Sequence, residues 1–172
     1  LLTFNSHQNL IAAYEEGFFD DLITPFKDVA RDGIMRNTPL EKLAQLRPAF
    51  DRKSGTLTAA NSTTLTDGAA FVLVCSERFA EENGLTPLAR ILSTAVTACS
   101  PEIMGIGPVE ATRKALKRAG ISLEEIGIIE LNEAFAAQSL AVISELKMDK
   151  SKVNIEGGAI ALGHPLGASG AR

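Results

Sequence analysis

The residues most suited to chemistry lie near the end of the sequence, where one histidine is surrounded by five glycines. His164 falls within residues 157–170, whose glycines permit positive φ angles and close backbone approach. Pro165 disfavours helix at the residue before it, so we expect His164 on a rigid turn. Residues 169–172 are typical of a first helical turn, whose free N–H groups attract anions. His164 could therefore be a general base beside an anion-binding backbone; alternatively, it is a surface histidine at a glycine-rich corner.

A second candidate lies where a predicted strand meets a predicted helix. Asn132 and Glu133 follow the apolar run at residues 126–131, and ligands in open α/β sheets bind beyond the carboxyl ends of strands. Asn132 could orient a water molecule or a substrate carbonyl. Alternatively, Asn132 is the N-cap of the helix expected at residues 134–146, a role that suits asparagine. Glu133 would then be a first-turn acid that complements the helix dipole.

The cysteines and the other histidine are weaker candidates. Cys75 lies in an apolar run, so we expect an inert thiol in the core. Cys99 follows a predicted strand in a polar loop, and we expect a thiol without function there. His7 lies on a predicted amphipathic helix and is expected at the surface or in packing. These residues show no zinc-ligand spacing, so no metal site is expected.

An alternation of strands and helices must position these residues. Apolar runs predict buried strands at residues 69–75 and 126–131, a weak alternation predicts a strand at residues 88–96, and a last strand is expected at residues 153–155. Capping residues, prolines and glycines predict helices from an N-cap at Ser6 towards Gly17, from Thr38 to Leu46, and at residues 77–83, 108–119 and 134–146. The alternation after residue 86 indicates an α/β architecture with both faces of the sheet covered.

The composition indicates a globular protein with a hydrophobic core. Of the 172 residues, 45% are hydrophobic, and the formal net charge is −4. These values argue against disorder and against a nucleic-acid partner, and no apolar run reaches membrane-spanning length. The sequence begins with Leu1 and stops at Arg172 inside a predicted helix. We therefore expect truncation at both ends, which would hide any targeting segment.

Two motifs taken together closely resemble the thiolase family. They are residues 131–138, which contain Asn132, and residues 157–172, which contain His164. Residues 46–51, 59–70 and 102–108 also match the family in order and spacing. The resemblance covers essentially the whole chain, which corresponds to the second half of a thiolase.

The resemblance implies a layered α/β fold made of two pseudo-equivalent halves and an inserted loop domain. Residues 1–66 correspond to the end of the loop domain. Residues 67–85 correspond to the last strand and helix of the first half. Residues 86–172 correspond to the second half without its last strands.

The resemblance also implies acyl transfer between a cysteine and coenzyme A. A cysteine of the first half attacks the 3-ketoacyl carbonyl, carbon–carbon cleavage releases acetyl-CoA, and a second CoA thiol accepts the acyl group. His164 matches the histidine that activates this cysteine and helps to form an oxyanion hole, and Asn132 matches the asparagine that holds a water molecule there. A thiolate needs a nearby base, and oxyanions need fixed donors. Six residues match substrate- or CoA-binding positions: Arg36, Phe50, Thr63, Leu65, Met104 and Phe135.

Two features depart from the family pattern. Thr63 stands where many relatives have a serine that contacts the pantetheine arm. Both catalytic cysteines are missing, because the nucleophile belongs to the first half and the second, in a Cys-x-Gly motif, would follow Arg172. Neither Cys75 nor Cys99 lies in a matching motif, so these residues alone are expected to be inactive.

We expect the C-terminal part of a 3-ketoacyl-CoA thiolase of fatty-acid β-oxidation, with CoA as substrate and no permanently bound cofactor. The alternatives are a biosynthetic acetoacetyl-CoA thiolase and an inactive acyl- or lipid-binding relative, which the intact Asn132 and His164 disfavour. A homodimer or homotetramer is expected, with a β-oxidation subunit as a further partner and without nucleic acid or a membrane span. The expected location is cytoplasmic, with an organelle as the alternative.

Overall fold

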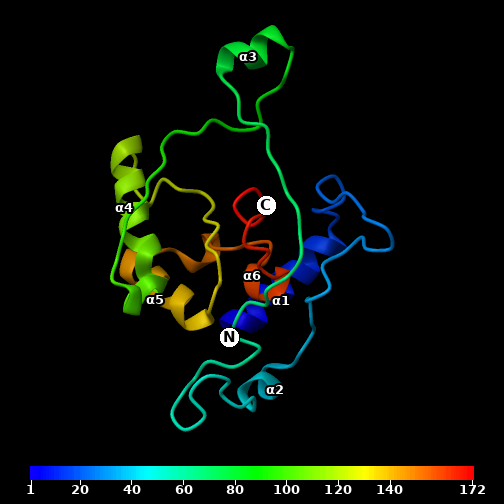
Figure 1. Cartoon of the computed structure of the whole chain (residues 1–172), viewed down its shortest axis with the longest axis vertical. Helices are drawn as coiled ribbons and strands as arrows, with labels where there is room; N and C mark the ends of the chain where they lie inside the picture. Colours follow the sequence, from blue (N-terminus) through cyan, green and yellow to red (C-terminus); the bar gives the residue numbers. More distant parts are fainter.

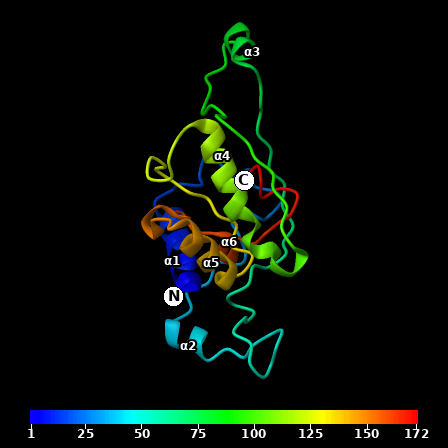
Figure 2. The same cartoon turned by 90° about the vertical axis from the view of Figure 1, so that its left-hand side faces the viewer.

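The computed structural model describes residues 1–172, and its regular elements are all helical. In chain order they are α1 (Leu2–Glu15), α2 (Leu40–Ala44), α3 (Glu77–Glu82), the 3-10 helix η1 (Pro101–Ile106), α4 (Gly107–Ala119), α5 (Ala136–Leu146), the 3-10 helix η2 (Lys150–Lys152) and α6 (Ala159–Leu162). In the body of the molecule α1 contacts α6 and α4 contacts α5 (Figure 1). The short helices α3 and α2 lie at opposite ends, as both views show (Figure 2).

Two hydrophobic clusters hold the body together. The first cluster lies between α4 and α5 and includes the last residue of the strand predicted at residues 126–131. Its members are Val109, Leu131, Val142, Ile143 and Met148. The second packs α1 against α6 and consists of Leu10, Ala13, Phe19 and Ala161. Because Leu131 and Ala161 belong to these clusters, both motif segments are anchored in the core.

Two of the predicted strands pair, but only at one point. The Ile129 N–H donates to the Lys152 carbonyl (2.8 Å), and the Asn154 N–H donates to the Ile129 carbonyl (2.9 Å). These bonds form an isolated parallel bridge between Ile129 and Val153. Pairing ends at Asn154 because its φ of 49° is left-handed and turns the chain out of the extended conformation. The regular strands predicted at residues 126–131 and 153–155 therefore reduce to this bridge.

The other two predicted strands are not buried. Residues 69–75 and 88–96 run through the extended chain on either side of α3 (Figure 1), where Phe71 is 94% exposed and Leu88 is fully exposed. A strand requires a neighbour for its ladder of hydrogen bonds, and no backbone of this chain pairs with either segment. The predictions of a buried strand at residues 69–75 and of a strand at residues 88–96 are therefore wrong here. The expected core position of Cys75 is wrong for the same reason, since this thiol is exposed.

The helices predicted at residues 77–83 and 108–119 are confirmed as α3 and α4, and both have capping residues at their ends. The Ser76 side chain accepts a hydrogen bond from the Phe79 N–H at the start of α3 (3.2 Å). Gly84 follows α3 with a φ of 63°, and Gly120 follows α4 with a φ of 72°, a conformation that glycine adopts without strain.

Three helix-start predictions are corrected. Helix α1 begins at Leu2, so Ser6 lies inside it and is not its N-cap. Helix α2 has Pro39 at its N-cap and no side-chain cap, so Thr38 does not cap it. Residues 166–171 form turns, although the Ser169 N–H donates to the Pro165 carbonyl in the helical pattern (3.0 Å). No helix of the structure is long and apolar enough to cross a bilayer.

Candidate active site

A loop at residues 61–68 lies between the two motif segments and binds both of them. On one side, the Thr63 N–H donates to the Ala134 carbonyl (3.0 Å) and the Ala136 N–H donates to the Asn61 carbonyl (2.9 Å). On the other side, the Thr64 carbonyl accepts from the His164 N–H (2.9 Å). The loop therefore brings together the chain after Asn132 and the turn that carries His164.

Asn132 is exposed and does not cap a helix. Helix α5 begins at Ala136, and its N-cap is Phe135, with φ −144° and ψ 142°. An antiparallel bridge between Ser62 and Phe135 keeps this residue extended, which delays the start of the helix. The alternative role of Asn132 as an N-cap is therefore wrong, and its amide is left exposed at the surface.

Glu133 is buried, with 3% of its surface exposed, and it is not a first-turn acid of α5. Its carboxylate accepts hydrogen bonds from the Ser6 hydroxyl (2.7 Å), the Asn154 amide (3.1 Å) and the Ile160 N–H (3.1 Å). Burial raises the pKa of the Glu133 carboxyl above its ordinary value, and these three hydrogen bonds oppose that shift. Sequence reasoning missed this role, because the close fit of Gly158, where a Cβ would overlap the carboxyl group of Glu133, appears only in the structure.

His164 lies on a half-buried turn after α6, as predicted. Gly163 has a φ of 87°, and a Cβ at this position would approach the Thr66 methyl group to 2.5 Å. The turn is therefore formed by a glycine that no other residue replaces without strain.

Ser169 orients the ring of His164. The ring Nδ1 lies 2.7 Å from the Ser169 Oγ, which donates to the Pro165 carbonyl (3.2 Å). A hydroxyl carries one proton, so with this donation Nδ1 must be the donor to Ser169. Nε2 then keeps its lone pair and is the nitrogen that can accept a proton from a substrate or a nucleophile.

The predicted binding residues are only partly gathered around the loop. The Thr63 hydroxyl donates to the Ala159 carbonyl of α6 (2.7 Å), and Leu65 is 73% exposed. The Phe50 and Phe135 rings pack edge to face, with centroids 5.9 Å apart. Two of the predicted residues are attached elsewhere: Met104 lies on η1, which packs on α5, and the Arg36 N–H donates to His7 Nδ1 (3.2 Å).

His7 lies in packing, one of the two places expected for it, and Cys99 is an exposed thiol after a segment without regular structure. His7 is buried in packing, and burial together with the Arg36 charge lowers the pKa of its imidazole. Cys99 is exposed beside a cavity of 200 Å³ between the ends of α4 and α5, and no histidine lines that cavity. A thiol without a neighbouring base is a poor nucleophile.

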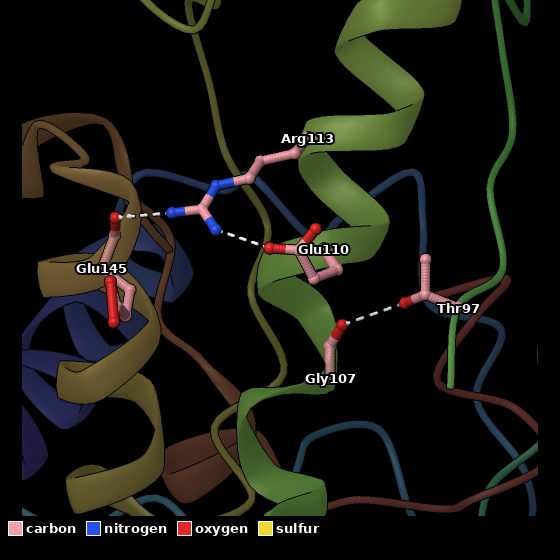
Figure 3. Close-up of polar contacts among 5 residues, drawn as sticks. All are labelled: Thr97, Gly107, Glu110, Arg113 and Glu145. Carbon is pink, nitrogen blue, oxygen red and sulfur yellow. Dashed lines mark hydrogen bonds and ion pairs between the residues drawn. The ribbon is translucent and has the colours of Figure 1, made fainter. Parts of the chain in front are cut away.

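Figure 3 shows polar contacts among five residues that line the cavity beside Cys99. Arg113 on α4 forms an ion pair with Glu110 (2.5 Å) and donates to the Glu145 carbonyl of α5 (3.3 Å), and the Thr97 hydroxyl donates to the Gly107 carbonyl (3.4 Å). These contacts tie α4 to α5 and to the segment after residue 96. The cavity is therefore a packing feature of the helix pair. No group of three or more His, Cys, Asp or Glu residues lies close enough to hold a metal ion.

Family models match nearly the whole chain. The model described as "Thiolase, N-terminal domain" matches residues 2–78, and the model described as "Thiolase, C-terminal domain" matches residues 85–172. Among curated proteins, the 3-ketoacyl-CoA thiolase of Photobacterium profundum is 52% identical over 181 residues, which cover 97% of this chain and 46% of that protein. The chain thus spans about half the length of the curated relatives it matches.

Solved structures match the fold. The Bacillus anthracis acetyl-CoA acetyltransferase superposes with a TM-score of 0.95 at 45% identity, covering 99% of this chain and 45% of that one. Human mitochondrial 3-ketoacyl-CoA thiolase in complex with CoA gives a TM-score of 0.91 at 44% identity, covering 99% and 44%. The dimeric peroxisomal thiolase of Saccharomyces cerevisiae gives 0.95 at 43% identity, covering 99% and 45%. The predicted layered α/β fold is confirmed, although the extended segments of this chain form no ladder among themselves.

Proposed function

This chain belongs to the thiolase family, and from that premise we propose that the complete protein cleaves 3-ketoacyl-CoA with CoA to acetyl-CoA and a shortened acyl-CoA. One observation carries the proposal: the loop at residues 61–68 binds both the segment after Asn132 and the turn of His164. The backbone that carries the base, His164, and the backbone that follows the amide, Asn132, are thereby bonded to one loop. The name of the curated relatives, 3-ketoacyl-CoA thiolase, supports the same reaction.

The two residues would act at different steps. His164 Nε2 accepts the proton of a cysteine thiol, and the thiolate adds to the 3-keto carbonyl. Cleavage of the carbon–carbon bond leaves an acyl-cysteine and the enolate of acetyl-CoA, which is protonated and released. Asn132 holds a water molecule that donates to the developing oxyanion. A second CoA thiolate then takes the acyl group. Because Cys75 and Cys99 match neither cysteine motif of the family, the proposal assigns the nucleophile to a cysteine outside these 172 residues.

CoA would lie along the loop and the neighbouring elements. We assign it contacts with Thr63, Leu65, Phe50 and Arg36, and the acyl pocket contacts with Met104 and Phe135. Since the Thr63 hydroxyl donates to Ala159, it is left to accept from a pantetheine N–H. The solved human thiolase that contains CoA supports a CoA site in this fold.

The division of the chain belongs to the same proposal. Residues 1–66 would be the end of the loop domain, residues 67–85 the last strand and helix of the first half, and residues 86–172 the second half. We propose a homodimer or homotetramer, which the dimeric yeast thiolase supports, with a β-oxidation subunit as a further partner and no resident cofactor. The bacterial origin of the curated relatives favours a cytoplasmic location.

A biosynthetic acetoacetyl-CoA thiolase is the second candidate. The superposition on an acetyl-CoA acetyltransferase favours it, since that enzyme name describes condensation of two acetyl units. Comparing the rates of thiolysis of acetoacetyl-CoA and of a long-chain 3-ketoacyl-CoA would separate the two.

His164→Ala in the complete protein tests the proposal. Loss of the base should lower kcat for thiolysis by on the order of 100-fold or more. The decrease in absorbance of the 3-ketoacyl-CoA enolate measures the rate. Near-normal turnover in this variant would remove His164 from the mechanism, and a wild-type protein without thiolysis would refute the proposed function itself.

A further inference from the structure

Glu133 is buried, directly follows Asn132 and has no role in the reaction as proposed so far. It is the only Asp, Glu, Lys or Arg side chain that is buried. A buried carboxylate is costly unless hydrogen bonds replace its hydration. The bonds that Glu133 makes should therefore show what it does.

Three separate segments donate hydrogen bonds to Glu133. Oε2 accepts from the Ser6 hydroxyl of α1 (2.7 Å) and from the Ile160 N–H of α6 (3.1 Å). Oε1 accepts from the Asn154 amide (3.1 Å). The Ser6 hydroxyl accepts in turn from the Gly158 N–H (3.0 Å), so the carboxylate and the serine together bind the turn that leads into α6.

On one side, this network fixes α6, the helix that leads to His164. Helix α6 comprises Ala159–Leu162 and has no side-chain cap at Gly158, and so short a helix has little stability of its own. Glu133 binds a free N–H of its first turn, where a negative charge is favourable. Because α6 leads through Gly163 directly to His164, the orientation of α6 decides where the imidazole lies.

On the other side, the network fixes Asn132. The Asn154 side chain pairs with both backbone groups of Leu131: its Oδ1 accepts from the N–H and its Nδ2 donates to the carbonyl, each at 2.8 Å. The same Nδ2 binds Glu133. The backbone is thus held immediately before and after Asn132, while its own side chain stays exposed.

We infer that Glu133 is a positioning residue that holds Asn132 and His164 in the relative geometry that catalysis requires. The inference rests on the proposed function. Displacements of about 1 Å between reacting groups cost up to about 100-fold in rate, and the Glu133 side chain binds both α6 and the Asn154 amide that holds Leu131. The Glu133 carboxyl does not need to contact the substrate for this role.

Glu133→Gln in the complete protein tests the inference. The side chain keeps its size but loses one acceptor and turns an N–H₂ group towards one of its donors. We expect kcat for thiolysis to fall by about 10-fold or more while KM for CoA changes by less than about 3-fold, because the geometry of the chemical step is altered and the CoA contacts are not. Assays well below the unfolding temperature separate this effect from a loss of folded protein.

A matched pair of serine variants provides the control, and a second route if Glu133→Gln does not fold. Ser6 and Ser139 are buried helix residues, 3% and 1% exposed, but only Ser6 binds Glu133. Ser6→Ala should lower kcat in the same sense as Glu133→Gln, and Ser139→Ala should leave kcat unchanged. Wild-type kcat in Glu133→Gln, or equal losses in the two serine variants, would overturn the inference.

A readout that does not depend on turnover separates this inference from the proposed function. In histidine-labelled protein, the NMR signals of the His164 ring, assigned with His164→Ala, should move in Glu133→Gln and stay in place in Ser139→Ala. Unmoved signals in Glu133→Gln would overturn the positioning role. An inactive wild-type protein that shows moved signals would instead refute only the proposed function.

Discussion

At the scale of single residues, Asn132 allows a structural role, capping a helix, to be distinguished from a chemical one, holding a water molecule. Its side chain is exposed, and the helix that it was expected to cap begins at Ala136 with Phe135 as N-cap. Removing the amide therefore leaves no helix end unsatisfied. An exposed amide between two anchored residues, Leu131 and Glu133, is instead well placed to hold a water molecule.

Asn132→Asp and Asn132→Ala test this separation. Both should change the unfolding free energy by no more than about 0.5 kcal/mol, the usual range for an exposed position. The alanine variant should lose on the order of 100-fold in kcat, since one oxyanion donor is removed, and the aspartate variant at least as much, since a negative charge faces the oxyanion. Thiolysis rates and thermal unfolding of the complete protein check both. Full activity combined with a lower melting temperature would support a structural role instead.

Thr63 has a hydroxyl group that serves two partners in our proposal. It donates to the Ala159 carbonyl (2.7 Å) and would accept from the pantetheine arm. Thr63→Val keeps the shape and removes both bonds, so we expect CoA binding and the unfolding free energy each to weaken by about 1 kcal/mol. Calorimetry with CoA and denaturant unfolding measure the two effects separately, and Thr63→Ser should restore both. If only the unfolding free energy falls, the Thr63 hydroxyl serves to bind α6 and does not contact CoA.

At the scale of elements, the fit between Gly158 and Glu133 joins α6 to the Asn132 segment. A Cβ on residue 158 would overlap the Glu133 carboxyl group, whereas a Cβ on Gly127 would meet nothing within 4 Å. Gly158→Ala should therefore destabilise the protein by about 1–3 kcal/mol, as overpacking does, and lower kcat. Gly127→Ala is the matched control and should stay within about 0.5 kcal/mol of wild type. Equal unfolding midpoints for the two variants would show that the contact is easily relieved.

Signals in the sequence correctly predicted those helix ends and turns that depend only on neighbouring residues. The glycines at 84 and 120 place the C-terminal ends of α3 and α4 correctly, because capping depends on residues within one turn. The turn at His164 was predictable for the same reason, since Gly163 permits a left-handed φ and Pro165 disfavours helix at His164.

Elements that depend on distant partners were not predictable. Helix α5 starts late because Ser62 bridges to Phe135, and no pattern near Asn132 shows that pairing. Residues 69–75 and 88–96 have the composition of strands, but a strand also needs a neighbouring backbone, and no backbone segment of this chain pairs with them. The network around Glu133 joins residues 6, 133, 154 and 160, and a single sequence read by itself does not show which distant residues contact each other.

At the scale of the whole molecule, the segments matched by the two family models form one body through polar contacts. Ser6 binds Glu133, and Arg172 forms an ion pair with Asp32 (2.5 Å), whose carboxylate also accepts from the Tyr14 hydroxyl (2.6 Å). The start and the end of the chain are thereby tied together. In contrast, α3 and the chain next to it extend away from this body (Figure 1), and the arm after α3 returns to α4, where Arg118 and Lys114 donate to the Thr94 and Val96 carbonyls.

The exposed segments on either side of α3 should determine whether a polypeptide of residues 1–172 alone self-associates. Phe71 is 94% exposed and Leu88 fully exposed, and neither run pairs with another backbone segment. Unpaired, apolar extended segments bind to one another and to other chains. We expect this polypeptide to self-associate, and Phe71→Glu to reduce the association, which size-exclusion chromatography with light scattering measures.

The same polypeptide should also show no thiolysis of acetoacetyl-CoA or of longer 3-ketoacyl-CoA. The reaction needs a thiolate beside a base, and the chain supplies the base, His164, without a suitable thiol. Cys75 lies in the extended segment before α3, and Cys99 borders a cavity that no histidine lines. The complete protein, assayed in parallel, is the positive control. Turnover by residues 1–172 that Cys99→Ser abolishes would contradict this prediction and would make Cys99 a nucleophile in its own right.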